Sequence, residues 1–337
     1  MKKNVFFFLC LLLLVSCRSH SRYFNNQGTV FGTYYNIRYE AESNQVTAIH
    51  DAFLRLDTSL SMFNDSSLIS RINRGETTAT NDLFEHVYET ALWLSEISNG
   101  AFDITVAPLV NAWGFGFKNQ PNVTPELIDS LRSMVGYQSI SLQNHQLIKQ
   151  HAQTMLDASA IAKGYACDLV ADVLRNAGAT NLLVDIGGEI VAEGVNEKGM
   201  PWRVGITKPI DDATCTQQEL QEIIQTSHIA MATSGNYRRF YYQDGERRSH
   251  TIDPRTGYPV QHNLLSATII APDCMTADAI ATACMVLGPD SALKLINTIN
   301  SQPSLISRLS SPVSCYFIVG DSVGMHVVTQ GMDAFIP

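Results

Sequence analysis

The chain has 337 residues, of which 45% are hydrophobic and 16% are charged, a composition typical of a globular protein and not of a disordered one. Its formal net charge of −9 disfavours nucleic acid as a partner, because phosphate contacts require a basic face. The 7 cysteines include no CxxC pair, which argues against a disulfide scaffold and against zinc. Beyond Cys10 and Cys17 we expect buried free thiols at Cys167, Cys215, Cys274, Cys284 and Cys315.

The N-terminus has the pattern of an export signal. Lys2 and Lys3 precede an apolar run over residues 5–15, which is too short to span a bilayer. The run ends in Leu14-Val15-Ser16-Cys17, which resembles a bacterial lipobox; the alternative is an ordinary signal peptide with an incidental Cys. We therefore expect a signal peptide over 1–16, lipidated Cys17 with a polar tether over 17–27, and one domain over 28–337. Lipidation would anchor the protein to a membrane without spanning it.

The first half of the predicted domain mixes strands and helices. Alternation predicts a strand over 29–39, and helical spacing predicts a helix over 46–56. Thr80 is the expected N-cap of a helix that ends near Ser98, before Asn99-Gly100. The glycines and aromatics of residues 113–117 indicate a mobile flap or a close approach of the backbone.

The second half begins with a strongly periodic helix, predicted over 159–177 and ended by Gly178. Later helices are expected over 277–287, capped by Thr276, and over 291–299. The expected strands are 182–186, 189–192, 202–206, 229–233, 240–242 and 265–270, with a closing hairpin of 315–319 and 324–328. Because helices and strands do not alternate strictly, the fold class is α+β.

Asp278 and Thr282 are four residues apart on the predicted helix, so their side chains share one face. A carboxylate with a hydroxyl is a hard-oxygen pair that suits Mg²⁺ better than zinc. The alternative is that Asp278 is a first-turn residue favoured by the helix dipole, with Thr282 simply packed.

Residues 157–166 place Asp157 and small residues at a helix start, where free amides favour phosphate. Lys163 can add positive charge to the same anion, and Gly164 inside a helix indicates close packing or ligand approach. The alternative is a capped amphipathic helix with a solvated lysine. Gly187-Gly188, between two predicted strands, is more typical of a turn than of a binding loop.

The run Ser249-His250-Thr251-Ile252-Asp253-Pro254-Arg255-Thr256-Gly257 combines an ionisable ring, a carboxylate and a guanidinium with a Pro-Gly turn. A surface hairpin would explain the turn but not the charged groups beside it. Asp253 is expected to orient either the His250 ring or Arg255, and the sequence does not separate the two.

These segments together resemble the FAD:protein FMN transferases of the ApbE family. The matching motifs follow the family's order over nearly the whole predicted domain, so the set is far more specific than any one motif. They are Gly32-Thr33, Gly100-Ala101-Phe102-Asp103, residues 157–166, Asp185-Ile186-Gly187-Gly188-Glu189, residues 250–257 and Ala277-Asp278-Ala279-Ile280-Ala281-Thr282. The resemblance implies a single T-fold-related unit of mixed helices and mainly antiparallel sheet, in a periplasm-facing lipoprotein of the bacterial cell envelope.

The resemblance further implies an enzyme that binds FAD with Mg²⁺, transfers the FMN half to a Thr hydroxyl of an acceptor protein and releases AMP. The family's acceptors include subunits of membrane redox pumps and other flavoproteins. The implied metal ligands are the Ala160 carbonyl, the Asp278 carboxylate and the Thr282 hydroxyl, with His250 as the base. The implied FAD contacts are Phe31, Phe63, Ala101, Phe102, Asp103, Asp157, Lys163 and Ile252.

The sequence departs from the family pattern at Phe31, where a Met commonly precedes Gly-Thr, and at Ala158-Ser159, which replace a Gly-rich lead-in. Two other functions fit the same residues. Water in place of the Thr hydroxyl would make the protein an FAD pyrophosphatase that yields FMN and AMP, and a lipoprotein that binds FAD without turnover is a third reading. A two-lobed solute-binding protein is disfavoured, because no linker divides the chain.

Overall fold

The computed structural model describes residues 22–116, 123–210, 219–237, 240–243 and 245–336. The predicted signal peptide, Cys17, residues 18–21 of the tether, Cys215 and Phe117 lie outside these residues. Within the described ranges, no helix is both long enough and apolar enough to cross a membrane.

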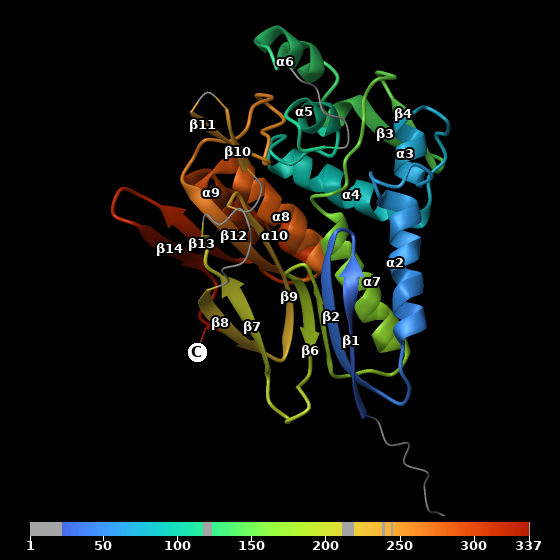
Figure 1. Ribbon diagram of the computed structural model, residues 1–337, viewed down its shortest axis with the longest axis vertical. Helices are drawn as coiled ribbons and strands as arrows, with labels where there is room; N and C mark the ends of the chain where they lie inside the picture. Colours follow the sequence, from blue (N-terminus) through green and yellow to red (C-terminus); the bar gives the residue numbers. More distant parts are fainter. Residues whose placement is uncertain (1–21, 117–122, 211–218, 238–239, 244, 337) are drawn as a thin grey trace, which may run out of the picture.

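A sheet of 8 strands runs through the described part of the molecule (Figure 1), and every neighbouring pair in it is antiparallel. In spatial order its strands are β1 (Arg22–Val30), β2 (Thr33–Ala41), β5 (Leu182–Ile186), β6 (Glu189–Glu193), β9 (His228–Gly235), β12 (Leu264–Ala271), β13 (Ser314–Gly320) and β14 (Met325–Gln330). The predicted α+β class with a mainly antiparallel sheet is confirmed. The predicted closing hairpin is also confirmed, as β13 and β14.

A single strand is expected over 29–39, but the structure has a hairpin of two strands, β1 and β2, in this region. Its turn is Phe31-Gly32, with φ of 51° and 73°, a backbone region that a non-glycine residue rarely adopts. Strand β1 begins at Arg22 and pairs with β2 from Arg22↔Ala41 onward. The expected boundary of the tether at Gln27 is therefore wrong, because residues 22–27 belong to the sheet.

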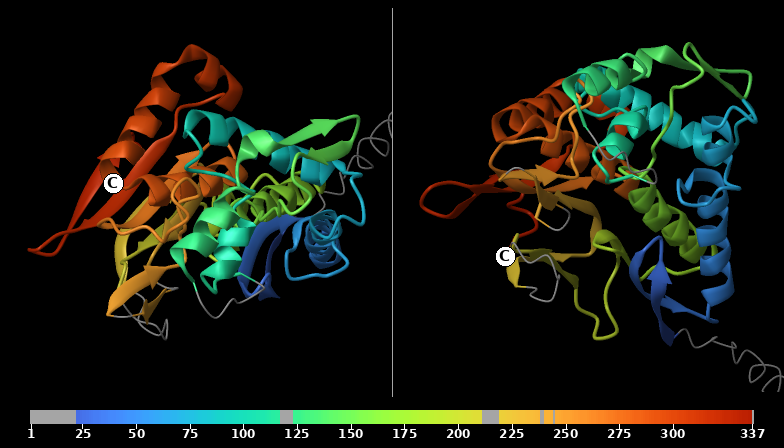
Figure 2. Two further views of the ribbon diagram at one scale, coloured as in Figure 1. Left: turned by 90° about the horizontal axis from the view of Figure 1, so that it is seen from above. Right: turned by 45° about the horizontal axis from the view of Figure 1, so that its top comes forward.

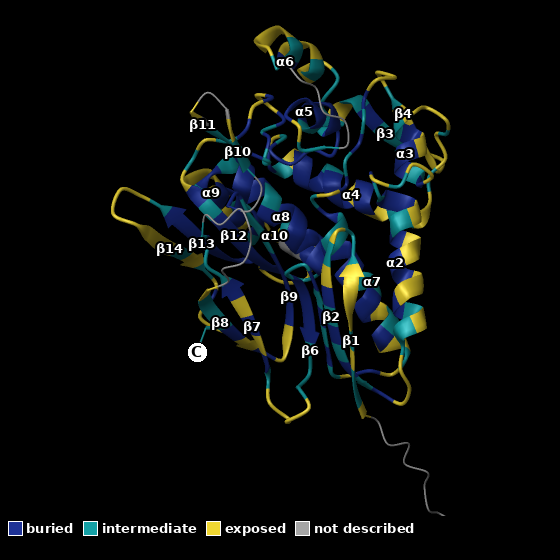
Figure 3. Ribbon diagram, viewed as in Figure 1, coloured by how far each residue is buried: buried dark blue, intermediate teal, exposed yellow. Residues whose placement is uncertain are grey.

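Helices cover one face of the sheet and extend beyond one of its ends (Figure 1). They are α2 (Val46–Leu60), α3 (Leu68–Asn73), α4 (Asp82–Ile97), α5 (Ala107–Ala112), α6 (Pro125–Arg132), α7 (Ala162–Asn176), α8 (Cys274–Leu287), α9 (Pro289–Ser301) and α10 (Pro303–Leu309), with a 3-10 turn at Tyr137–Ser139. Helices α7 and α8 contact the sheet directly, and α2 packs outside α7 (Figure 2). Figure 3 shows α8 buried almost throughout, as expected for a helix that is apolar on all sides, whereas α2 keeps an exposed outer face.

Small two-stranded sheets complete the fold: β3 (Ile140–Gln143) with β4 (Gln146–Lys149), β7 (Trp202–Thr207) with β8 (Leu220–Thr226), and β10 (Phe240–Gln243) with β11 (Glu246–Ser249). Hairpin β7–β8 covers the sheet face opposite the helices. Alternation along β13 shows this, because Cys315 and Phe317 pack in the helix-side core while Tyr316 and Ile318 pack with Trp202.

Two of the predicted helix caps are wrong by a few residues. Asn81, not Thr80, caps α4, since its side chain accepts the Phe84 N–H. Asp273, not Thr276, caps α8, and its carboxylate accepts the Thr276 N–H at 2.7 Å. The neighbouring residues are all common caps, so only the backbone path decides which one is used.

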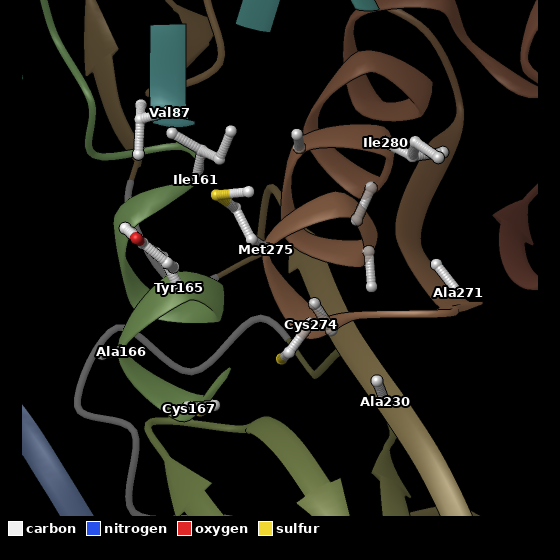
Figure 4. Packing of buried hydrophobic residues seen from close by; sticks show 14 of the residues in the cluster. Val87, Ile161, Tyr165, Ala166, Cys167, Ala230, Ala271, Cys274, Met275 and Ile280 are labelled. Atoms are coloured by element: carbon white, nitrogen blue, oxygen red, sulfur yellow. The ribbon is translucent and has the colours of Figure 1, made fainter. Parts of the chain in front are cut away.

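Helices α7 and α8 pack against each other in the core (Figure 4). The thiols of Cys167 and Cys274 are fully buried there, and they donate to the carbonyls of Glu189 and Met231 at 3.1 and 3.3 Å. Burial raises the pKa of both thiols. The expectation of buried free cysteines is confirmed for Cys167, Cys274, Cys284 and Cys315.

The buried carboxylate of Asp168 in α7 should make the stability of the folded protein depend on pH. Its carboxylate accepts the N–H groups of Cys274 and Met275 at the start of α8. Burial, and to a smaller extent Asp273, raises the pKa of Asp168 to about 8, although the two N–H donors oppose the shift. The folded state holds the proton of Asp168 more tightly than the unfolded chain does, so protonated Asp168 adds to the free energy of unfolding. This stabilisation is fully present at low pH and is lost as pH rises toward 8.

An Asp168→Asn variant lacks this titration. We therefore expect the free energy of unfolding of the variant, relative to the parent, to rise by about 1–3 kcal/mol between pH 5 and pH 8. Urea unfolding at the two pH values measures the difference. If the difference between the free energies of unfolding of parent and variant stays constant over this pH range, the titration assigned to Asp168 is wrong.

Candidate active site

A cavity of about 1800 Å³ lies between the β1–β2 turn, the start of α7, the β5–β6 turn, α8 and the segment before β12. This is larger than a typical small-ligand cavity of about 300–1000 Å³. Every described residue that the sequence assigns to the site lines it: Phe31, Phe63, Ala101, Phe102, Asp103, Asp157, Ala160, Lys163, His250, Ile252, Asp278 and Thr282.

Gly164 lets α7 and α8 meet at the cavity. A Cβ on this residue would lie 2.2 Å from the Cys274 carbonyl oxygen and 2.8 Å from the Asp278 Cβ. The Gly164 N–H donates to Asp278 Oδ2 at 3.0 Å, which fixes the buried carboxylate against α7. The close packing expected at Gly164 is therefore confirmed.

Three charged side chains gather at this contact. The Lys163 ammonium donates to the Glu189 carboxylate, and Asp278 lies close enough to act on both. Burial acts to lower the pKa of Lys163, but the two carboxylates raise it well above its usual value. Burial raises the pKa of Asp278, while Lys163 and the Gly164 N–H act to lower it. The Lys163 side chain is 35% exposed but ion-paired, so the alternative of an unpaired lysine on a solvated helix face is wrong.

The oxygen atoms beside Asp278 are chemically suited to a hard cation. Asp278 and Thr282 both line the cavity from α8, and the Thr282 hydroxyl is hydrogen-bonded to Ser234 Oγ at 3.2 Å. The described residues contain no group of three His, Cys, Asp or Glu side chains arranged for a metal. One carboxylate with neutral oxygens nevertheless fits Mg²⁺, which keeps several waters and shares ligands with a phosphate.

Most amides at the start of α7 already have acceptors. The Ala162 N–H donates to the Ala158 carbonyl at 2.9 Å and the Gly164 N–H to Asp278 Oδ2 at 3.0 Å, which leaves the Lys163 N–H without a partner among the described residues.

The N-cap residue of α7, Ile161, makes no capping hydrogen bond through its side chain. Asp157 fixes the preceding turn by accepting the Ser159 N–H at 2.8 Å. A helix N-terminus beside a lysine attracts phosphate, because the helix dipole and a remaining free N–H both favour negative charge.

Asp253 pairs with Arg255, through Oδ1 to Nε at 2.9 Å and Oδ2 to Nη2 at 2.8 Å, which answers the question that the sequence left open. Trp113 stabilises the turn at residues 253–257, because its Nε1 donates to the Gly257 carbonyl at 2.8 Å. His250 lines the cavity, and the Phe115 ring lies edge-on to its imidazole at 6.3 Å between centroids.

The expectation for residues 113–117 is confirmed in part. A Cβ on Gly116 would lie 2.0 Å from Asn111 Oδ1, so the backbone approach there is close. Trp113 is buried in a small apolar cluster with Ile128 and Ile252. The segment therefore braces the turn that carries His250.

Gly257 is required by the turn for two reasons. Its φ is +83°, and a Cβ would lie 2.5 Å from Ile128 Cγ2. We expect Gly257→Ala to destabilise the protein by about 2–4 kcal/mol, combining backbone strain with overpacking. Gly199→Ala is the matched control, since Gly199 has φ of +71° with open space around it, and about 1 kcal/mol is expected. Chemical denaturation compares the two, and equal losses would show that the packing contributes nothing.

Two aromatic side chains flank the opening of the cavity. Phe31 packs edge-on against Phe53 at 5.8 Å from the strained β1–β2 turn. Phe63 is 72% exposed although it lines the cavity. An exposed ring beside a cavity is available to stack on a planar ligand.

Asp103 is buried and fixes the loop after α6. It accepts the Thr105 N–H and hydroxyl through Oδ1, and the Tyr137 N–H at 2.7 Å through Oδ2. Burial raises the pKa of Asp103, while these donors lower it. Its position on the cavity wall is as expected, and its contacts show an additional structural role.

One wall of the cavity and one charged residue beside Lys163 are not predicted by the sequence motifs. Hairpin β7–β8 contributes Trp202, Arg203 and Leu220, which no motif marked. Glu189 was assigned only to a turn motif, yet it is buried and ion-paired with Lys163. The turn at Gly187-Gly188 is itself confirmed between β5 and β6.

A buried carboxylate, a paired lysine, an imidazole and a helix N-terminus in one cavity are typical of an enzyme that acts on a phosphate-containing ligand. Comparison with known proteins is consistent with this class. The model of the ApbE family matches residues 31–305, and the chain belongs to that family.

Similar proteins match over most of their length. The chain is 38% identical over 291 residues to the FAD:protein FMN transferase of Vibrio cholerae, covering 83% of this chain and 86% of that protein. It is 36% identical over 315 residues to the protein of that name from Haemophilus influenzae, covering 88% and 90%. The solved structure of the flavin transferase ApbE from Vibrio cholerae matches with a TM-score of 0.80 at 33% identity, covering 93% and 98%.

Proposed function

We propose that this protein transfers the FMN moiety of FAD to a Thr hydroxyl of an acceptor protein, with Mg²⁺, and releases AMP. The observation that carries the proposal is that Asp278, Lys163 and His250 line one cavity of about 1800 Å³. Relatives at 36–38% identity named FAD:protein FMN transferase support the reaction class.

The proposed reaction is a phosphoryl transfer. The Thr oxygen of the acceptor forms a bond to the phosphorus of the FMN half, and the bond from that phosphorus to the bridging oxygen breaks. AMP leaves with the bridging oxygen and its electron pair. Such a reaction needs an in-line nucleophile and neutralisation of charge on the pyrophosphate.

Different residues of the chain would bind the pyrophosphate, hold the metal ion and contact the flavin. The Lys163 N–H and the positive end of the α7 dipole attract the pyrophosphate, with the Lys163 ammonium, which is paired with Glu189, nearby. Asp278, Thr282 and the Ala160 carbonyl would hold Mg²⁺, which supplies Lewis-acid neutralisation of the phosphate oxygens when bound. Phe31 and Phe63 would pack against the flavin. The rest of the FAD would contact other residues that line the cavity: Ala101, Phe102, Asp103, Asp157 and Ile252.

His250 takes the proton of the attacking Thr. A hydroxyl is a weak nucleophile unless a base lies within hydrogen-bond reach, and an imidazole suits that task near neutral pH. The Asp253–Arg255 pair and Gly257 fix the loop that carries the ring. The large cavity supports a two-substrate site, because it exceeds the volume of a usual small-ligand pocket.

Nucleotide analysis distinguishes this proposal from its two alternatives. The protein is incubated with FAD and Mg²⁺, with and without an acceptor fragment carrying the Thr target, and free nucleotides are separated by chromatography. A transferase releases AMP only when acceptor is present and leaves no matching free FMN. A pyrophosphatase releases AMP and free FMN equally without acceptor, and a binding protein leaves FAD intact.

We also propose that lipidation at Cys17 anchors the protein to a membrane of the bacterial envelope, facing the periplasm. The support is the lipobox-like Leu14-Val15-Ser16-Cys17. Cys17→Ala should move the protein from the membrane fraction to the soluble periplasmic fraction. A variant that stays with the membrane would contradict the anchor.

A further inference from the structure

Glu189 carries a buried charge that the reaction outlined above does not use. Its carboxylate lies on the cavity wall at the start of β6 and is 2% exposed. Oε1 accepts from Lys163, while Oε2 is buried without a hydrogen-bond partner among the described residues. The Lys163 side chain is 35% exposed, but burying a carboxylate with an unsatisfied oxygen still costs stability, so this arrangement calls for an explanation in function.

Lys163 has two acidic neighbours and binds one of them. Glu189 and Asp278 both raise its affinity for a proton, and both line the cavity. The ammonium donates to Glu189, whereas Asp278 Oδ2 is held by the Gly164 N–H. Without Glu189, the Asp278 carboxylate would be the remaining acidic partner for the Lys163 ammonium.

We propose that Glu189 is a positioning residue that holds the Lys163 ammonium so that Asp278 stays available to a divalent cation. The inference rests on the metal site of the proposed function. In the wild type the Lys163–Glu189 pair is neutral as a unit, and Asp278 keeps the negative charge that attracts the cation. In the absence of Glu189 the lysine competes with the cation for Asp278 by forming an ion pair.

The fold offers a matched control on the same two elements. Arg175 of α7 pairs with Glu193 at the other end of β6, and neither residue lines the cavity. Glu193→Gln therefore removes an α7–β6 ion pair without touching the site. A Glu189→Gln/Lys163→Met double variant removes both charges of the inner pair at nearly constant volume, which buried pairs commonly tolerate.

The test measures Mn²⁺ binding to the mature protein without FAD, by calorimetry and by electron paramagnetic resonance. Glu189→Gln should weaken Mn²⁺ binding by about 10–100-fold, as loss of a residue that supports a metal ligand commonly does. Glu193→Gln should stay within about twofold of the wild type, and the double variant should recover to within about threefold. Lys163→Met alone should bind at least as tightly as the wild type, which tests the idea even if Glu189→Gln fails to fold.

The outcomes separate the inference from the proposed function. A wild type that binds no Mn²⁺ overturns the metal site, and this inference falls with it. A wild type that binds Mn²⁺ while Glu189→Gln binds equally well overturns only the role of Glu189. A double variant as weak as Glu189→Gln also overturns it, because relief of competition from Lys163 would then restore nothing.

Discussion

Replacing Asp278 with asparagine is expected to reduce flavin transfer by on the order of 10³-fold or more. Asp278 is the only side-chain carboxylate assigned to the metal, and an amide oxygen binds Mg²⁺ far more weakly than a carboxylate does. The asparagine keeps an oxygen for the Gly164 N–H, so the α7–α8 contact should survive. Transfer rates over a series of Mg²⁺ concentrations measure the loss.

Asp168→Asn is the matched control for this variant. Asp168 lies at the same α7–α8 contact and is also hydrogen-bonded to backbone N–H groups, but it does not line the cavity. We expect it to change stability with pH and to leave Mg²⁺-dependent turnover within about threefold of the parent. Undiminished Mg²⁺-dependent turnover in Asp278→Asn would remove the metal assignment.

His250→Ala is expected to lower the transfer rate by about 10²–10⁴-fold, the usual contribution of a positioned base. The loss should fall on the rate at saturating FAD and acceptor, because the imidazole acts on the attacking hydroxyl. Transfer rates measured from about pH 5.5 to 9 for parent and variant report the loss.

His228→Ala controls for loss of a histidine elsewhere. His228 is exposed at the start of β9 and does not line the cavity, so its variant should keep the parent rate and pH profile. Equal FAD affinity in His250→Ala and its parent would place the defect in the chemical step. A His250→Ala variant with full rates across this pH range would exclude His250 as the base.

The residues assigned to the site lie in short segments whose local structure the sequence largely determines. Asp278 and Thr282 share a helix face by their spacing alone, and the Pro-Gly turn fixes the neighbourhood of His250. The order of these motifs along the chain then gave the family, which supplied roles that spacing does not. The resulting residues all line one cavity, although no single motif indicates that they meet.

The failures have physical causes beyond the local sequence. The Phe31-Gly32 turn requires a left-handed phenylalanine, which propensity disfavours, so a single strand was predicted where a hairpin forms. The strand character of residues 22–27 arises from pairing with β2 and not from their polar sequence. Glu189 is an ordinary strand residue until α7 brings Lys163 against it, a contact 26 residues apart in the chain.

The most direct test of the central claim is covalent flavinylation of an acceptor. The mature protein, FAD and Mg²⁺ are incubated with an acceptor fragment carrying the Thr target and with its Thr→Ala variant, then denatured and examined by flavin fluorescence and mass spectrometry. We predict a fluorescent acceptor band with FMN attached through a phosphoester to the Thr, and no band for the Thr→Ala fragment. An unlabelled acceptor, with FAD either intact or converted to free FMN, would contradict the transferase assignment.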